Sequence, residues 1–133
     1  MSITSFPGGV DTQLRDKNRT ERKSSTYTVV NVTDCGKTFV SDVDTVYTLH
    51  ATSDGSIYTF IYDGKDGVGQ ISIDPAAADG IAAVGTSVVN KDLINTRATA
   101  KRGDYVTVAA GIGATGITAW NVVAQRGIWA KEA

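Results

Sequence analysis

Apolar and polar residues alternate in short runs along most of the chain after residue 26. The run IYTFIY at 57–62 is the clearest, and similar β-branched and aromatic runs occupy 27–32, 38–40, 45–49 and 70–74. Alternation with a period of two places successive side chains on opposite faces of a strand. Asp54-Gly55 and Asp63-Gly64 mark turns between the runs. The pattern predicts an all-β protein, either an antiparallel β-sandwich of jelly-roll type or a barrel.

The last third, GDYVTVAAGIGATGITAWNVVAQRGIWAKEA, predicts an antiparallel hairpin. Two long β-prone runs flank a glycine-rich turn, and the second run carries Trp120. The turn, at 111–116, matches the dinucleotide-binding string G-x-G-x-x-G. That motif requires a helix directly after it, whereas ITAWNVV is β-prone. The glycines are therefore assigned to a hairpin loop, where they permit positive φ angles.

Residues 1–26 differ in composition from the rest of the chain. They hold five basic and three acidic residues and few apolar ones, and Pro7-Gly8-Gly9 interrupts any early element. Such a segment buries too little surface to order by itself, which predicts a polar, mostly unstructured N-terminal arm at 1–26 and a β-sandwich domain at 27–133. The arm is either a frayed terminus, a short polar helix or a segment that orders on a partner. In the last case the contacts come from the apolar anchors Phe6 and Leu14 and from the basic residues Arg15, Lys17, Arg19, Arg22 and Lys23.

Length and charge limit the class of protein. A chain of 133 residues corresponds to one domain with a real core. The formal net charge of −1 provides no global basic field, which argues against a nucleic-acid partner. No apolar stretch has the length that spans a bilayer, and 1–18 lacks an apolar signal segment, so we expect no membrane partner and synthesis in the cytosol.

Candidate catalytic chemistry is sparse. Cys35 and His50 are the sole cysteine and histidine, which is too few for a structural zinc site. Cys35 is expected as a partly buried side chain in a turn, and His50 as a surface residue at a strand end. Asp42 and Asp44 would point the same way on a strand, but carboxylates beside a turn usually form a solvated edge. The sequence therefore predicts a protein that is not an enzyme, with no cofactor and no metal.

The order of several short motifs resembles a family. Asp34-Cys35-Gly36-Lys37-Thr38-Phe39 is similar to the opening D-x-G-K-x-F of small β-modules in tailed-bacteriophage structural proteins. A strand that ends in Leu49, a turn at Gly55 and the Y-x-F strand of Tyr58 and Phe60 continue the likeness. Further segments follow in the same order, and the likeness extends to residue 130. These segments are Asp79-Gly80-Ile81, Ile94-Asn95-Thr96, 98–106, Trp120-Asn121-Val122 and Gly127-Ile128-Trp129.

This resemblance implies a structural protein of a virion. The short chain favours a head decoration (cement) protein that binds the major capsid protein on the outer capsid surface and commonly forms a homotrimer, with the arm ordering across capsid subunits. The alternative is a head or tail fibre module or a host-surface glycan-binding module, with Tyr58, Tyr62 or Trp129 stacking on sugar rings. A hydrolase would need a convincing set of catalytic groups, and none is present. The candidate core or trimer-interface aromatics are Phe39, Tyr58, Phe60, Trp120 and Trp129.

Overall fold

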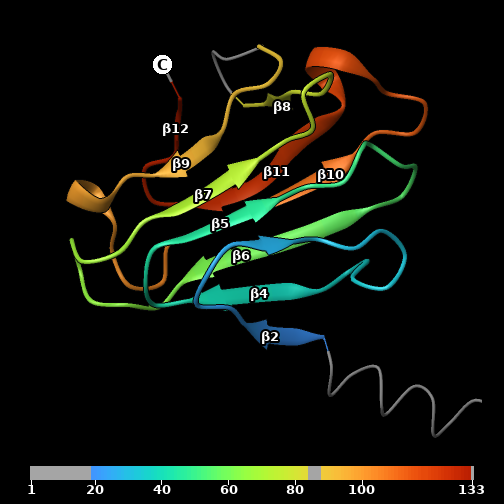
Figure 1. The fold of residues 1–133 in the computed structure, drawn as a ribbon. Coiled ribbons are helices and arrows are strands. Elements are labelled where there is room, and N and C mark those ends of the chain that lie inside the picture. Colours follow the sequence, from blue (N-terminus) through green and yellow to red (C-terminus); the bar gives the residue numbers. More distant parts are fainter. Residues whose placement is uncertain (1–18, 84–87, 133) are drawn as a thin grey trace, which may run out of the picture.

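The computed structural model describes residues 19–83 and 88–132 and consists of two β-sheets packed face to face (Figure 1). The described residues contain no α-helix, and their helical structure is limited to two 3₁₀ turns, η1 (Arg97–Thr99) and η2 (Gly116–Thr118). The prediction of an all-β sandwich is confirmed. The two sheets differ in size, because one has six strands and the other five.

The six-stranded sheet has the order β2-β4-β6-β10-β11-β8, and the five-stranded sheet has the order β12-β9-β7-β5-β3. The strands of the first sheet are β2 (Thr20–Arg22), β4 (Thr38–Ser41), β6 (Ile57–Tyr62), β8 (Ile81–Ala82), β10 (Tyr105–Ala110) and β11 (Trp120–Arg126). Those of the second are β3 (Tyr27–Thr28), β5 (Thr45–Thr48), β7 (Ile71–Asp74), β9 (Leu93–Asn95) and β12 (Ala130–Lys131).

Strand pairing is mixed rather than purely antiparallel. From β2 to β7 each strand lies in the sheet opposite to the strand before it. Strands that are next but one in sequence therefore run in the same direction, and β2–β4, β4–β6, β3–β5 and β5–β7 all pair in parallel. The turns between these strands cross from one sheet to the other instead of closing hairpins. This part of the chain winds around the core, which then lies between the two sheets.

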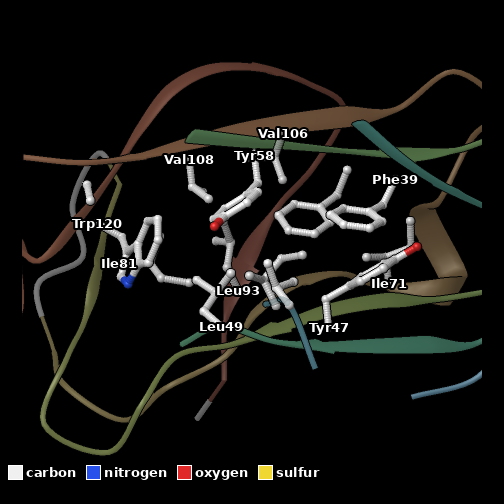
Figure 2. Close-up of a cluster of buried hydrophobic side chains, with 14 of the residues drawn as sticks. Phe39, Tyr47, Leu49, Tyr58, Ile71, Ile81, Leu93, Val106, Val108 and Trp120 are labelled. Atoms are coloured by element: carbon white, nitrogen blue, oxygen red, sulfur yellow. The ribbon is translucent and has the colours of Figure 1, made fainter. Parts of the chain in front are cut away.

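The core is rich in aromatic side chains from both sheets (Figure 2). Phe39 and Phe60 stack with their ring centroids 5.7 Å apart, and Tyr47 of the opposite sheet lies 4.7 Å from Phe60. At the other end, Trp120 packs 5.9 Å from Tyr58. All five of these rings are fully buried. The alternation of buried and half-exposed residues along β4, β6 and β10 agrees with the period of two in the sequence.

The C-terminal hairpin has the predicted form. β10 and β11 pair antiparallel, from Tyr105 opposite Arg126 to Ala110 opposite Trp120, with a bulge where the register shifts between Thr107 and Val108. The glycine-rich loop connects them, and the Gly113 N–H donates to an Asp54 carboxylate oxygen at 2.8 Å. The glycines therefore serve a hairpin loop, as expected.

The sandwich includes part of the segment that we expected to be an arm. β2 forms an edge of the six-stranded sheet and pairs with β4, with Thr20 opposite Thr38 and Arg22 opposite Val40. The sequence boundary after residue 26 is thus too late, because main-chain pairing with β4 orders a polar strand that has no apolar pattern of its own. Residues 1–18 lie outside the described residues.

Candidate interaction surfaces

The edge formed by β2 carries paired charges. Arg22 donates to both carboxylate oxygens of Asp63, at 3.0 and 2.5 Å, and lies 3.6 Å from Asp42. A guanidinium that binds a carboxylate in this forked way fixes its orientation. The hydrogen bonds from Arg22 hold the pKa of Asp63 below its usual range. Arg22, which the sequence suggested as a free contact for a partner, is therefore engaged within the domain.

Two other basic groups at this edge, Lys23 and Lys37, are also paired with acids. Lys23 lies 3.1 Å from Glu21 and 3.8 Å above the ring of Tyr27, and Lys37 pairs with both Glu21 and Asp34. Hydrogen bonds from the two lysines lower the pKa of Glu21. The β2 edge, which we define as four basic and four acidic residues, has no net charge; its members are Arg19, Arg22, Lys23, Lys37, Glu21, Asp34, Asp42 and Asp63.

The contacts of Asp34 account for the residue types in the D-x-G-K-x-F segment, Asp34 to Phe39. Its buried carboxylate accepts hydrogen bonds from the Tyr27 hydroxyl at 2.6 Å and from the Val30 N–H at 2.8 Å, and it lies 3.1 Å from the Lys37 ammonium. Burial alone would raise the pKa of Asp34, but these three donors hold it below the usual value. Gly36 has a φ of +82°, and Phe39 enters the core. The segment therefore holds the turn in place at the start of β4.

No helix or strand of the described residues covers the outer face of the six-stranded sheet (Figure 1). Paired positions form rows across the strands. The threonine row crosses from Thr20 through Thr38 and Thr59 to Thr107, and the Thr59 and Thr107 hydroxyls are hydrogen-bonded at 2.9 Å. The neighbouring apolar row contains Val40, Ile61 and Tyr105, with Arg22 and Arg126 at its two ends.

Three central strands, β4, β6 and β10, contain no charged residue on either face. Thr38, Thr59 and Thr107 on the outer face are half-buried, as are Ile61 and Tyr105. A flat face that lacks charge at its centre and has arginines at its rim has the composition of a protein–protein contact, where charged residues are depleted and Tyr and Arg enriched. The sequence did contain a signal for this contact face, because none of the three runs has a charged residue on either side of the strand. That signal was missed.

The end of β11 is attached to the body through Asp104. The buried Asp104 carboxylate accepts from Asn95 Nδ2 at 3.0 Å and from the Lys101 N–H at 2.9 Å, and Asn95 Nδ2 also donates to the Ile128 carbonyl at 3.2 Å. Gly127 has a φ of +92°, and a Cβ there would lie 2.5 Å from both carboxylate oxygens. Only glycine fits between β11 and Asp104 at the crossing to β12.

The aromatic residues suggested for glycan binding are mostly inaccessible. Tyr58 and Tyr62 are fully buried, so the expectation that either stacks on a sugar ring is wrong. Burial raises the pKa of Tyr58 to about 12. The Tyr58 hydroxyl is hydrogen-bonded to His50 Nε2 at 2.7 Å, and the half-buried His50 ring packs edge-on against Trp120. Trp129 is half-buried and donates from Nε1 to the Arg126 carbonyl at 3.0 Å.

Cys35 and Asp44, two of the residues considered for chemistry, both lie at the surface. Cys35 is exposed, not partly buried, because it lies in the turn before β4; its thiol lies 3.7 Å from the Gly55 carbonyl oxygen. Asp44 pairs with Arg97 at the surface. Among residues 19–83 and 88–132, no three His, Cys, Asp or Glu side chains are grouped so that they could hold a metal ion. Within the same ranges, no helix has the length and apolar character needed to cross a membrane.

An acidic group lies where β9 and β12 meet. Asp92 N–H donates to Glu132 Oε1 at 3.0 Å, and the Glu132 N–H donates to the Asp92 carbonyl at 2.9 Å. Burial and the neighbouring Asp74 carboxylate raise the pKa of Asp92 to about 6. Burial also lowers the pKa of Lys131. Asp74, Asp92 and Glu132 thus form an acidic group at this corner of the fold.

The structure places the predicted residues in three groups. Phe39, Tyr58, Phe60 and Trp120 lie in the core, and Trp129 packs against it. Arg19, Arg22 and Lys23 lie at the β2 edge. The other suggested arm residues, Phe6, Leu14, Arg15 and Lys17, lie outside the described residues. No protein-family model, no curated protein and no solved structure matches the chain.

Proposed function

We propose that this protein is a bacteriophage virion structural protein, and specifically a head decoration protein that binds the major capsid protein on the outside of the head. The observation that carries the proposal is the uncharged outer face of the six-stranded sheet, with its threonine row and apolar row. The resemblance of residues 27–130 to phage structural modules supplies the biological setting. Clamping neighbouring capsid subunits would add buried surface to a shell that holds packaged DNA.

The use of ionisable groups supports a binding role rather than catalysis. Asp34, Asp63 and Asp104 all accept hydrogen bonds that hold turns or strands in place. His50 is likewise engaged with the Tyr58 hydroxyl. Catalysis needs a titratable group free to meet a substrate, whereas these groups are committed to the fold. We propose accordingly that the protein is not an enzyme.

The capsid contact has two parts in this proposal. The outer face supplies the flat contact, and residues 1–18 supply the arm that the sequence predicts to order on capsid subunits. A homotrimer, which the resemblance implies, would hold three weak contacts at high effective concentration. Because the charges of the β2 edge are matched within the domain, we expect the domain's own contribution to depend only weakly on salt.

The test is binding of the purified protein to expanded, undecorated heads. We expect saturation at a fixed stoichiometry, and about tenfold weaker binding for Thr59→Lys, which places a charge at the centre of the outer face. Thr48→Lys is the matched control, since Thr48 is a half-buried threonine of the other sheet. Deletion of residues 1–18 leaves β2 in place and tests the arm separately.

Failure of both the wild type and the truncated protein to bind heads would contradict the proposal. The fibre or glycan-binding alternative makes the opposite prediction: the protein without residues 1–18 would be retained on host cells or on a glycan array, and would ignore heads. Trp129 is the one residue of the three suggested aromatics that is not fully buried, so Trp129→Ala would reduce such retention.

A further inference from the structure

Among the described residues, β12 is the outermost strand of the five-stranded sheet, and it pairs with β9 (Figure 1). Two residue pairs join these strands, Ala130 with Ile94 and Lys131 with Leu93. By contrast, β7 and β9 each have a neighbouring strand on both sides. Local opening is easiest where the fewest contacts hold an element. At this end of the sheet, that element is β12.

The end of β12 is held by the segment just before β9. The Glu132 N–H donates to the Asp92 carbonyl at 2.9 Å, and the Asp92 N–H donates to Glu132 Oε1 at 3.0 Å. Lys131 Nζ donates to the Lys91 carbonyl at 3.3 Å. Two of these three hydrogen bonds use main-chain groups of Asp92. The position of Asp92 therefore decides how firmly the end of β12 is held.

The strand register places three carboxyl groups side by side. Leu93 is opposite Ile73 in the antiparallel pair of β9 with β7, and opposite Lys131 in the pair of β9 with β12. One residue further along, the same register forms a row across the three strands that consists of Asp74, Asp92 and Glu132. Because Ile73 and Leu93 point into the core, this row lies on the outer face of the sheet. Like charges directly opposite each other destabilise a strand pair.

We propose that β12 is a pH-dependent latch, held against β9 while Asp92 is protonated and released when Asp92 ionises beside Asp74 and Glu132. Burial and the Asp74 carboxylate raise the pKa of Asp92 to about 6, with a smaller contribution from Glu132. The Lys131 ammonium acts in the opposite direction and has the smallest effect. Lys91 precedes Asp92 in the chain. Release of β12 uncovers the main chain of β9 with which it pairs.

The direction of the pH effect follows from the raised pKa. The closed latch holds the Asp92 proton more tightly than the open latch, in which Asp92 is less buried, lies further from Glu132 and has a pKa nearer the ordinary value of about 4. The closed form is thus favoured at low pH and loses that advantage as the pH rises through 6. Asp74 stays beside Asp92 in both forms, because β7 and β9 remain paired. We therefore expect part of the full effect, about a tenfold rise in opening between about pH 5 and pH 7.5.

Hydrogen exchange of single amides measures this opening. The Glu132 N–H reports on the latch, and the Lys23 N–H, which donates to the Val40 carbonyl at 3.0 Å beside β2, is the reference. We expect the protection factor of the Glu132 amide to fall about tenfold over this pH range, with a midpoint near 6. The protection factor of the Lys23 amide should stay constant, because the pKa of its neighbour Glu21 is lowered and Glu21 stays ionised throughout.

Three conservative substitutions test the cause. Asp92→Asn keeps the shape of the side chain but cannot ionise, so the pH response of the Glu132 amide should disappear. Asp74→Asn removes the neighbouring charge and should move the midpoint to lower pH. Asp44→Asn is the matched control, because Asp44 lies at the other end of β5 and β7, where it accepts from the Gln70 N–H at 3.0 Å. It should leave the response unchanged, and a thermal melt would verify that each variant is folded.

The latch is supported by a loss of protection at the Glu132 amide that Asp92→Asn abolishes and Asp44→Asn preserves. It is overturned if the Glu132 and Lys23 amides lose protection to the same extent, or if neither does. A response that persists in Asp92→Asn, or a midpoint that Asp74→Asn leaves in place, would also overturn it. The measurement uses the free protein, so its result is independent of capsid binding.

Discussion

The six-stranded sheet has two very different edges. At β2, four basic and four acidic side chains surround a three-residue strand, and Arg22 and Lys37 fix it to the body through ion pairs. Near the other edge, β11 has seven residues of which one, Arg126, is charged, and the two-residue strand β8 pairs with it at Trp120 and Asn121. Dense charge prevents an edge from pairing with other strands, whereas an uncharged edge remains available for pairing. The comparison indicates that the charged residues of the β2 edge protect that edge of the sheet from further pairing.

The largest effect is expected where β11 is anchored. Gly127→Ala places a methyl group against the Asp104 carboxylate and keeps a positive φ, so we expect a loss of about 3–4 kcal/mol in the free energy of unfolding. Urea denaturation measures it. Gly113→Ala is the control, because Gly113 also has a positive φ but no atom lies within 4 Å of its Cβ position. It should cost about 1 kcal/mol. Equal losses would contradict the steric account.

The next effect breaks the β2 edge. Asp34→Ala removes the acceptor for the Tyr27 hydroxyl and the Val30 N–H and leaves Lys37 with one partner, which should cost about 3 kcal/mol. Asp44→Ala, which breaks an exposed pair with Arg97, should cost at most about 1 kcal/mol. Thermal unfolding of both variants at pH 7 is the measurement. A similar loss for the two variants would show that the buried contacts of Asp34 stabilise the fold no more than an exposed ion pair does.

The two sheets should also respond to pH in opposite directions. Asp34, Glu21 and Asp63 have lowered pKa values, so their stabilisation is present above the unfolded value of about 4 and is lost as the pH falls. The pKa of Asp92 is raised to about 6, so the folded state holds its proton more tightly than the unfolded state does. Its contribution is present at low pH and is lost as the pH rises through 6.

Asp92→Asn isolates the second effect. We expect the variant to be more stable than the wild type by about 1 kcal/mol at pH 7, discounted for the partial exposure of the group, and to differ little at pH 4. Denaturant unfolding at both pH values measures it. A variant that is destabilised at pH 7 would show that the Asp92 carboxylate is stabilising when charged, and the assigned cause of its raised pKa would be wrong.

The smallest effect concerns the exposed part of the β2 edge. Arg22→Gln removes a forked pair with Asp63, but both side chains are partly exposed, so we expect a loss of stability much smaller than that caused by Asp34→Ala. The loss should shrink in high salt. Thermal melts at low and high salt measure it. A loss comparable to that of Asp34→Ala would mean that the whole edge, and not only its buried carboxylate, holds β2.

Local pattern was enough to predict β4, β5, β6, β7 and the closing hairpin, but not the polar strand β2. Tyr58 and Phe60 alternate with half-exposed residues, and the turn at Asp34 and Gly36 lies where the sequence indicated. Parallel pairing could not be predicted in this way. A turn such as the one at 42–44 has the same composition whether it closes a hairpin or crosses to the opposite sheet, and the alternation of side chains is the same in both cases.

The interaction surfaces depend on long-range pairing and were therefore missed. Thr20, Thr38, Thr59 and Thr107 form a row only because the register places them side by side. Arg22 looked like a free basic residue because its partner, Asp63, is 41 residues away.

The central claim is that this protein binds the outside of a phage head, and electron microscopy of expanded heads mixed with the purified protein tests it most directly. The account predicts added density at fixed positions on the outer capsid surface, with the six-stranded sheet facing the shell and reduced occupancy for Thr59→Lys. Heads that remain bare at saturating protein, or density confined to the tail or fibres of the virion, would contradict it.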